Sequence, residues 1–175
     1  MDAAHFVFAP FLGHLWCFAR LFIKAPSGRK RFNVLGALNA ITHEMITITN
    51  TGYINACSVC QLLIKLTHAC GDVPISIVLD NARYQKCRLV QNTSKLFGIE
   101  LLYLPAYSPN LNLIERMWKF VKKKCLYSKF YSDFNAFSKS ITQCLEKTSG
   151  CYKNELDSLL SLNFQSFSKS YLMAG

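Results

Sequence analysis

The sequence predicts an α/β fold in which a mixed sheet carries helices on both faces. The first half of the chain reads as successive strands, and the second half alternates helical and strand-like segments. Consecutive strands pair antiparallel, whereas strands separated by a helix pair in parallel. The chain has 175 residues, 51% of them apolar, which suits a single domain with a substantial core.

The first half contains four strand-like segments. They are His5 to Phe8, Leu15 to Phe22, the run RKRFNVLGALNA (29–40) and the run EMITITNTGYI (44–54). The last of these alternates and is rich in β-branched residues, which favour strands.

The second half follows a helix–strand order. The predicted elements are a helix from Asn55 to Leu66 that is capped by Asn55 and ended by Gly71, a strand at 74–79, a helix from Tyr84 to Phe97 stopped by Gly98, a strand at 99–105, a turn at 106–112, and helices at Leu111 to Tyr127, Asp133 to Glu146 and Asn154 to Leu160. The strand PISIVL (74–79) is a short run that is apolar apart from Ser76, which is typical of a parallel strand covered on both faces.

Composition narrows the function classes. A net charge of +10 favours a polyanionic partner, most often nucleic acid. The apolar N-terminal stretch fits neither a signal peptide nor a membrane span, because Asp2, Pro10, His14 and Arg20 interrupt it. The eight cysteines contain one CxxC and no zinc-like partner motif, so we expect most of them to be core residues in a reducing cytoplasm.

Asp80 ends the apolar run ISIVLD (75–80). In open α/β sheets, sites form beyond the carboxyl ends of the parallel strands, where Asp80 is expected. An Asp-Asn pair also starts turns and caps helices. Both interpretations stay open on this segment alone.

Glu115 lies in the first turn of the helix predicted from Leu111. Its spacing from Asn112 fits a capping box, and Lys119 stands at i+4, so a structural role is the simpler interpretation. The helical wheel buries Leu113, Met117, Phe120 and Val121. It leaves Glu115, Trp118, Lys119 and Lys122 on an exposed face, where a large aromatic residue favours an interaction surface and the lysines favour phosphate contacts.

Asp2 precedes the first strand and, taken alone, would be a polar terminus. Three carboxylates from distant segments make chemical sense as ligands of Mg²⁺, which prefers hard oxygen donors. Two such ions can activate an attacking oxygen and stabilise the leaving oxygen of a phosphodiester.

The sequence resembles the catalytic half of mariner-like bacterial insertion-sequence transposases, which are DDE endonucleases with a ribonuclease H-like fold. The resemblance rests on Asp80-Asn81-Ala82, the thirty-four residues between Asp80 and Glu115, and the run YLPAYSPNLNLIERMWKFVKK (103–123). The runs DAAHFV (2–7) and GRKRFNVLGALNA (28–40), with YIN (53–55), extend it from Asp2 to about Phe167.

This resemblance implies a function and a site. Asp2, Asp80 and Glu115 would be the catalytic acids and would bind Mg²⁺ or Mn²⁺, two ions in all. The reaction would be metal-dependent hydrolysis of a phosphodiester, followed by attack of a DNA 3′-hydroxyl on target DNA. The partner would be double-stranded DNA at transposon ends and target, contacted by Arg83, Trp118, Lys119, Lys122 and Lys123.

The resemblance also implies how the chain is organised into domains, which partners it has and where it is located. Residues 1–170 would form a single catalytic domain, and the N-terminal helix-turn-helix region of the family would be absent through truncation. A homodimer is left open, no membrane contact is expected, and the location would be the bacterial cytoplasm, at the nucleoid through DNA. The alternative is a catalytically inactive remnant that binds DNA or dimerises.

Overall fold

A computed structural model describes residues 1–8, 18, 30–105 and 111–161. Its elements, in chain order, are β1 (Asp2–Phe8), β2 (Lys30–Leu38), β3 (Met45–Asn50), α1 (Ala56–Cys70), β4 (Ile75–Leu79), α2 (Arg88–Leu96), β5 (Ile99–Tyr103), α3 (Leu113–Cys125), α4 (Phe134–Glu146) and α5 (Lys153–Leu159). The predicted strand at Leu15 to Phe22 lies outside the described residues apart from Phe18, as does most of the predicted turn at 106–112.

The strands form two groups that meet where β1 begins. β1, β2 and β3 form an antiparallel sheet in that order, and β4 pairs with β5 in parallel. The backbone nitrogen of Met1 donates to the carbonyl oxygen of Val78, 2.7 Å away, and so links the start of β1 to β4. The predicted α/β class, with both antiparallel and parallel strand pairs, is confirmed, but among the described strands the hydrogen-bonded pairs form two sheets instead of one mixed sheet.

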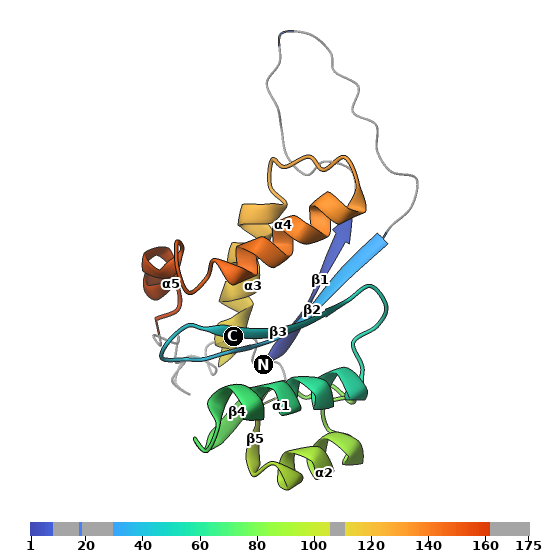
Figure 1. The fold of residues 1–175 in the computed structure, drawn as a ribbon, viewed down its shortest axis with the longest axis vertical. Coiled ribbons are helices and arrows are strands. Elements are labelled where there is room, and N and C mark those ends of the chain that lie inside the picture. The colour runs from blue at the N-terminus through green and yellow to red at the C-terminus, as the bar shows by residue number, and fades with distance from the viewer. Residues whose placement is uncertain (9–17, 19–29, 106–110, 162–175) are drawn as a thin grey trace, which may run out of the picture.

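Helices cover both faces of the three-stranded sheet (Figure 1). One core cluster combines Phe6 of β1 and Val34 of β2 with the buried faces of α3 and α4. The other combines Leu35 of β2 with α1, α2 and the β4–β5 pair. Because side chains alternate along a strand, β2 serves both cores, and its residues Phe32 to Gly36 are all buried.

Local signals in the sequence set the ends of the first helix. The Asn55 side chain accepts from the Ser58 backbone N–H, and the Ser58 hydroxyl accepts from the Asn55 backbone N–H, which completes a capping box. Gly71 ends α1 with a φ of 60°, as predicted from a conformation that glycine adopts freely. Gly98, with a φ of 63°, follows α2 in the same way.

Two local predictions are wrong. The second helix begins at Arg88 rather than Tyr84, because residues 82–86 form a separate turn in which buried Gln85 accepts a hydrogen bond from the Tyr103 hydroxyl. The strand β4 is also not covered on both faces: Val78 is 40% exposed, whereas Ile77 and Leu79 are buried.

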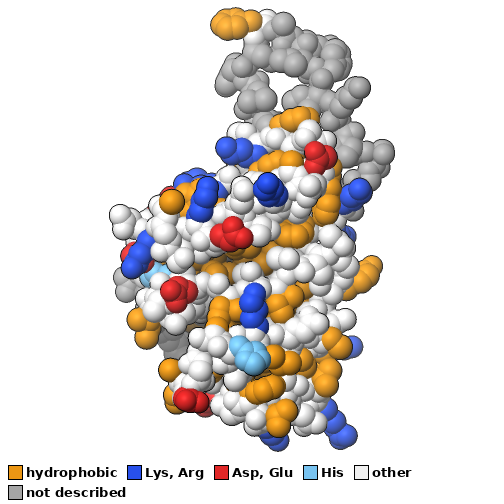
Figure 2. All heavy atoms as spheres, in the orientation of Figure 1, with side chains coloured by type: hydrophobic (Ala, Val, Ile, Leu, Met, Phe, Trp, Pro, Cys, Tyr) orange, Lys and Arg blue, Asp and Glu red, His pale blue; other side chains and the backbone are white. Residues whose placement is uncertain are grey.

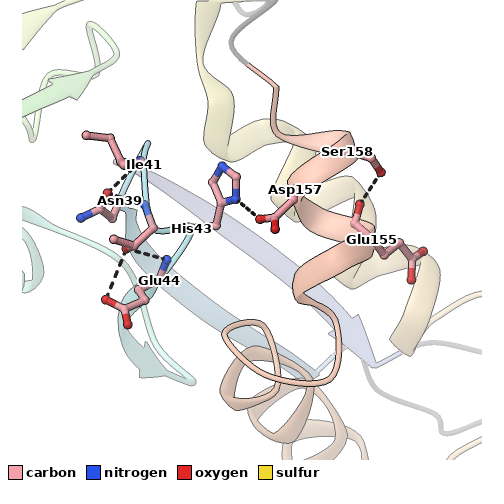
Figure 3. A network of polar contacts seen from close by, with 8 residues as sticks. Asn39, Ile41, His43, Glu44, Glu155, Asp157 and Ser158 are labelled. Atoms are coloured by element: carbon pink, nitrogen blue, oxygen red, sulfur yellow. Dashed lines mark hydrogen bonds and ion pairs between the residues drawn. The ribbon is translucent and has the colours of Figure 1, made fainter.

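The β2–β3 hairpin contacts the last helix, α5, although the two segments are far apart in the sequence. His43, in the hairpin, lies 2.6 Å from Asp157 of α5, measured from Nδ1 to Oδ1 (Figure 3). Asn39 shapes the hairpin by accepting from the backbone N–H groups of Ile41 and Thr42.

Among the described helices, none is long and apolar enough to cross a membrane.

The cysteines of the described residues are all free. Cys60, Cys125 and Cys144 are buried, as expected of core residues, whereas Cys57 and Cys151 are exposed. The only CxxC therefore has one thiol in the core and one at the surface.

Candidate active site

Asp2 is held from two sides. As the first residue of β1 it pairs with Gly36 of β2, and its carboxylate oxygen Oδ2 accepts a hydrogen bond of 3.1 Å from the indole N–H of Trp118. Burial is the main cause that raises the pKa of Asp2, and the charges of Asp80 and Glu115 raise it further. The backbone N–H of Ala3 and the amino group of Met1 act in the opposite direction. Asp2 thus lies in a partly desolvated position within reach of two other acids.

Asp80 follows β4 directly, at the carboxyl end of this parallel strand. Its Oδ1 accepts from the Ala82 backbone N–H at 3.1 Å, so the turn-forming interpretation of the sequence describes part of its role. The side-chain amide of the next residue, Asn81, donates to the carbonyl oxygen of Leu104. The backbone N–H of Leu104 donates to the carbonyl oxygen of Leu79, 2.9 Å away. The end of β5 therefore fixes the turn that carries Asp80.

Glu115 lies in the first turn of α3, but it does not cap the helix. Asn112 is the N-cap residue and makes no side-chain hydrogen bond to the helix, so the capping box expected from the sequence does not form. Within the described ion pairs, none joins Glu115 to Lys119. The two structural roles that the sequence offered for Glu115 are thus both left unfilled.

The three acids come from three separate elements and approach one another. The Met1 amino group donates to the carbonyl oxygen of Val78, two residues before Asp80, so the start of β1 lies beside the end of β4. Burial lowers the pKa of this amino group to about 6, and the charges of Asp2 and Asp80 act in the opposite direction. No group of three His, Cys, Asp or Glu side chains is gathered closely enough to hold a metal ion among the residues that the structure describes. The ion pairs within the described ranges join none of the three carboxylates to a lysine, arginine or histidine side chain. As a donor set, three carboxylates nevertheless suit a hard divalent cation, and they repel one another in its absence.

Trp118 is not on an exposed face, which corrects the helical-wheel prediction. Its side chain is 4% exposed and belongs to the core between α3 and the sheet. The reason is tertiary: Gly36 lacks a side chain where the ring lies, and the indole N–H finds its acceptor in Asp2. Trp118 is therefore not available to stack on a DNA base or to form an interaction surface.

The predicted basic contacts differ in exposure. Arg83, Lys119 and Lys123 are exposed, and Lys122 is half-buried. Arg83 follows the turn of Asp80, and the lysines share α3 with Glu115. Figure 2 shows one face of the molecule, over which lysine and arginine side chains are scattered among exposed hydrophobic ones.

The sequence did not single out Gly36 or the Trp118–Asp2 hydrogen bond. A usable signal was present, because an isolated glycine inside a strand pattern often marks a close approach by another group. What approaches it could not be read from the sequence, since Trp118 lies 82 positions further along the chain.

Comparison with known proteins identifies the fold. The family model described as DDE superfamily endonuclease matches residues 19–138. The structure of the Mos1 transposase paired-end complex with left transposon end matches with a TM-score of 0.61 at 15% identity, covering 88% of this chain and 54% of the other. No curated protein matches the sequence.

Two further structures show how wide the resemblance is. A pre-cleavage Mos1 transpososome gives a TM-score of 0.62 at 14% identity, with 95% of this chain and 56% of the other covered. The catalytic core domain of BIV integrase gives 0.54 at 14% identity, with 73% and 87% covered. The chain spans about half the length of the Mos1 transposase chains. At these identities the likeness establishes the fold, which is the ribonuclease H-like one predicted.

Proposed function

Because the chain belongs to the DDE superfamily of endonucleases, we propose that it is a DNA transposase catalytic domain. Its reaction is hydrolysis of a DNA phosphodiester, followed by attack of the resulting 3′-hydroxyl on a phosphodiester of target DNA, which joins the two DNAs and releases a target 3′-hydroxyl. Similar structures include Mos1 transposase paired with a transposon end, a Mos1 paired-end complex with Mn and a Mos1 strand transfer complex, which supports DNA and a divalent metal as partners of this chain.

The observation that carries the proposal is the convergence of the three acids from distant segments. The Met1 amino group donates to Val78 of β4, which joins the start of β1, with Asp2, to the strand that Asp80 follows, and Trp118, three residues after Glu115 on α3, donates to Asp2. In keeping with this arrangement, the charges of Asp80 and Glu115 both raise the pKa of Asp2. Carboxylates near one another destabilise one another unless a cation or a proton compensates. We infer that Asp2, Asp80 and Glu115 hold Mg²⁺ or Mn²⁺, with two ions as the expected number.

The chain's own residues have separate parts in this reaction. Bound metal would activate the attacking oxygen and stabilise the leaving oxygen. The turn after β4 orients Asp80, the β1–β2 ladder orients Asp2, and the first turn of α3 presents Glu115. Arg83, Lys119, Lys122 and Lys123 bind phosphates of the DNA and set its register rather than its sequence. Association with bacterial DNA stays a prediction that goes with this function, and so does a homodimer.

The test is nicking of supercoiled plasmid DNA by purified protein in Mg²⁺ or Mn²⁺. We expect Asp80→Asn and Glu115→Gln each to lower the rate by more than about 100-fold, because each removes a metal ligand. Asp72→Asn is the matched control, since this exposed aspartate precedes the same strand that Asp80 follows.

Two results would decide against the proposal. Equal rates for the parent and both acid variants would show that nicking comes from elsewhere. A parent that binds DNA with the expected salt dependence but never nicks it would favour the silent DNA-binding fragment instead.

A further inference from the structure

Trp118 links the core of the domain to an acid of the proposed site. It lies three residues after Glu115 on α3, a spacing that places both side chains on one side of the helix. Its ring is buried, yet its N–H reaches Asp2 Oδ2 at 3.1 Å, across 116 positions of sequence. The helix that presents Glu115 is therefore joined to Asp2 through the side chain of Trp118.

Gly36 provides the space for this ring. A Cβ atom at position 36 would lie 2.9 Å from Cη2 and 3.1 Å from Cζ2 of Trp118, and 2.8 Å from Cε of Met45. Among the described glycines, only Gly71 and Gly98 have a positive φ, so backbone conformation does not require glycine at position 36. Gly36 is also the ladder partner of Asp2, so the same residue pairs with the acid and admits the group that holds it.

The chemistry of the indole group suits a carboxylate that has to remain a ligand. Indole N–H is a donor only and carries no charge, so it orients the carboxylate without neutralising it as a lysine or arginine would. A carboxylate has about four lone-pair sites, so the hydrogen bonds from Trp118 and from the Ala3 backbone N–H leave others for a cation. Groups that hydrogen-bond to metal-binding carboxylates fix their orientation and contribute to metal affinity.

We propose that Trp118 is a positioning residue that fixes the carboxylate of Asp2 for metal binding, with Gly36 making room for its ring. This inference deepens the proposed function and rests on it. A purely structural account is that a buried tryptophan needs some acceptor for its N–H, and Asp2 happens to supply one. The two accounts differ in one respect: only positioning makes metal affinity depend on the N–H group.

The experiment removes that N–H and keeps the ring. In a Trp16→Phe background, Trp118 is replaced by 3-benzothienylalanine, in which sulfur takes the place of the N–H. Mn²⁺ affinity is measured directly, from the electron paramagnetic resonance signal of free Mn²⁺, and stability is followed by urea unfolding. Trp118→Phe serves as a second variant, and Phe120→Leu is the matched control, since Phe120 is equally buried on α3.

We expect the benzothienyl protein to bind Mn²⁺ about 10-fold more weakly than the parent, as is usual when a supporting hydrogen bond to a metal ligand is lost. In an Asp2→Asn background the same replacement should have no further effect. Phe120→Leu should lose stability and keep its Mn²⁺ affinity.

Three outcomes would overturn the inference. Unchanged Mn²⁺ affinity of the benzothienyl protein, with Asp80→Asn still weakening binding, would refute positioning by Trp118 and leave the proposed function intact. Equal losses of affinity in Trp118→Phe and Phe120→Leu would assign the effect to stability alone. If Asp80→Asn and Glu115→Gln both leave the affinity of the parent unchanged, the proposed function fails, and this inference fails with it.

Discussion

Replacing Gly36 by alanine tests how tightly the ring of Trp118 is packed against β2. The added Cβ would lie 2.8 Å from Met45 Cε and 2.9 Å from Trp118 Cη2, whereas ordinary contacts of this kind are 3.4–4 Å. Met45 can move, because its Cε is the far end of a flexible side chain. The indole ring is rigid and buried between α3 and the sheet, so either the ring or the backbone has to shift.

Two opposing terms set the size of the effect. Inserting a methyl group into a filled core costs about 1–3 kcal/mol. Alanine also restricts the unfolded chain more than glycine does, which stabilises the protein by about 0.4–1 kcal/mol where the backbone conformation is permitted. Since Gly36 is not at positive φ, the second term applies, and we expect Gly36→Ala to lower the free energy of unfolding by about 0.5–2 kcal/mol.

Urea unfolding of four proteins isolates the contact with Trp118: the parent, Gly36→Ala, Trp118→Phe and the double variant. Phenylalanine lacks the atoms Cη2 and Cζ2, so alanine at position 36 should cost about 1 kcal/mol less in the Trp118→Phe background. Gly36→Ala combined with Met45→Ala is the control for the other close contact. A Gly36→Ala variant that is as stable as the parent or more stable would refute close packing between Gly36 and the Trp118 ring. The same follows if Gly36→Ala lowers the free energy of unfolding equally with tryptophan and with phenylalanine at position 118.

Three further predictions concern caps and charges. Asn55→Ala removes the capping box of α1 and should lower the free energy of unfolding by about 1 kcal/mol in urea, whereas Asn55→Ser should retain most of it. Lys119→Ala and Lys123→Ala should each weaken binding to any DNA sequence and reduce the salt slope by about one, as measured by fluorescence anisotropy, and Lys139→Ala on α4 should change neither. The Ala136 backbone N–H, which Asp133 accepts at the start of α4, lowers the pKa of Asp133. The charge of Asp133 therefore stabilises the fold at pH values above the usual aspartate pKa of about 3.9, and this stabilisation is lost as the pH falls through the lower pKa of the folded state. The thermal unfolding temperatures of Asp133→Asn and the parent should accordingly converge in acid. A difference between them that widens in acid would contradict this role of Asp133.

The elements that the sequence predicted well are those fixed by neighbouring residues. Asn55 and Gly71 bound the first helix because a side-chain cap and a positive φ are local properties. The order of strands and helices sufficed to predict which strands pair antiparallel and which pair in parallel, since connection rules leave few topologies. Asp80 could be predicted at a strand end, and Glu115 at a helix start, by the same local reasoning.

The predictions that failed depended on partners far along the chain. The helix expected from Tyr84 starts late because the Tyr103 hydroxyl binds the Gln85 carbonyl oxygen, which holds a separate turn in place. The strand β4 is apolar apart from Ser76, yet it alternates in burial, because the buried Ile77 and Leu79 belong to the core that α1 and α2 share, while Val78 is exposed. Hydrophobicity alone does not reveal which face of a strand a helix covers.

Trp118 shows why a two-sided helical wheel is insufficient for a helix that carries a site residue. The wheel divides residues into a buried apolar face and an exposed polar face, and it assigned Trp118 to the second because Glu115 and Lys122 lie beside it. The helix α3 has a third side, on which half-buried Glu115 and buried Trp118 both approach Asp2. This side carries a half-buried acid beside a buried aromatic residue, and the facing strand has to leave a gap for the aromatic ring. Here Gly36 provides the gap, so the glycine in β2 and the acid–aromatic pair in α3 have meaning only when they are considered together.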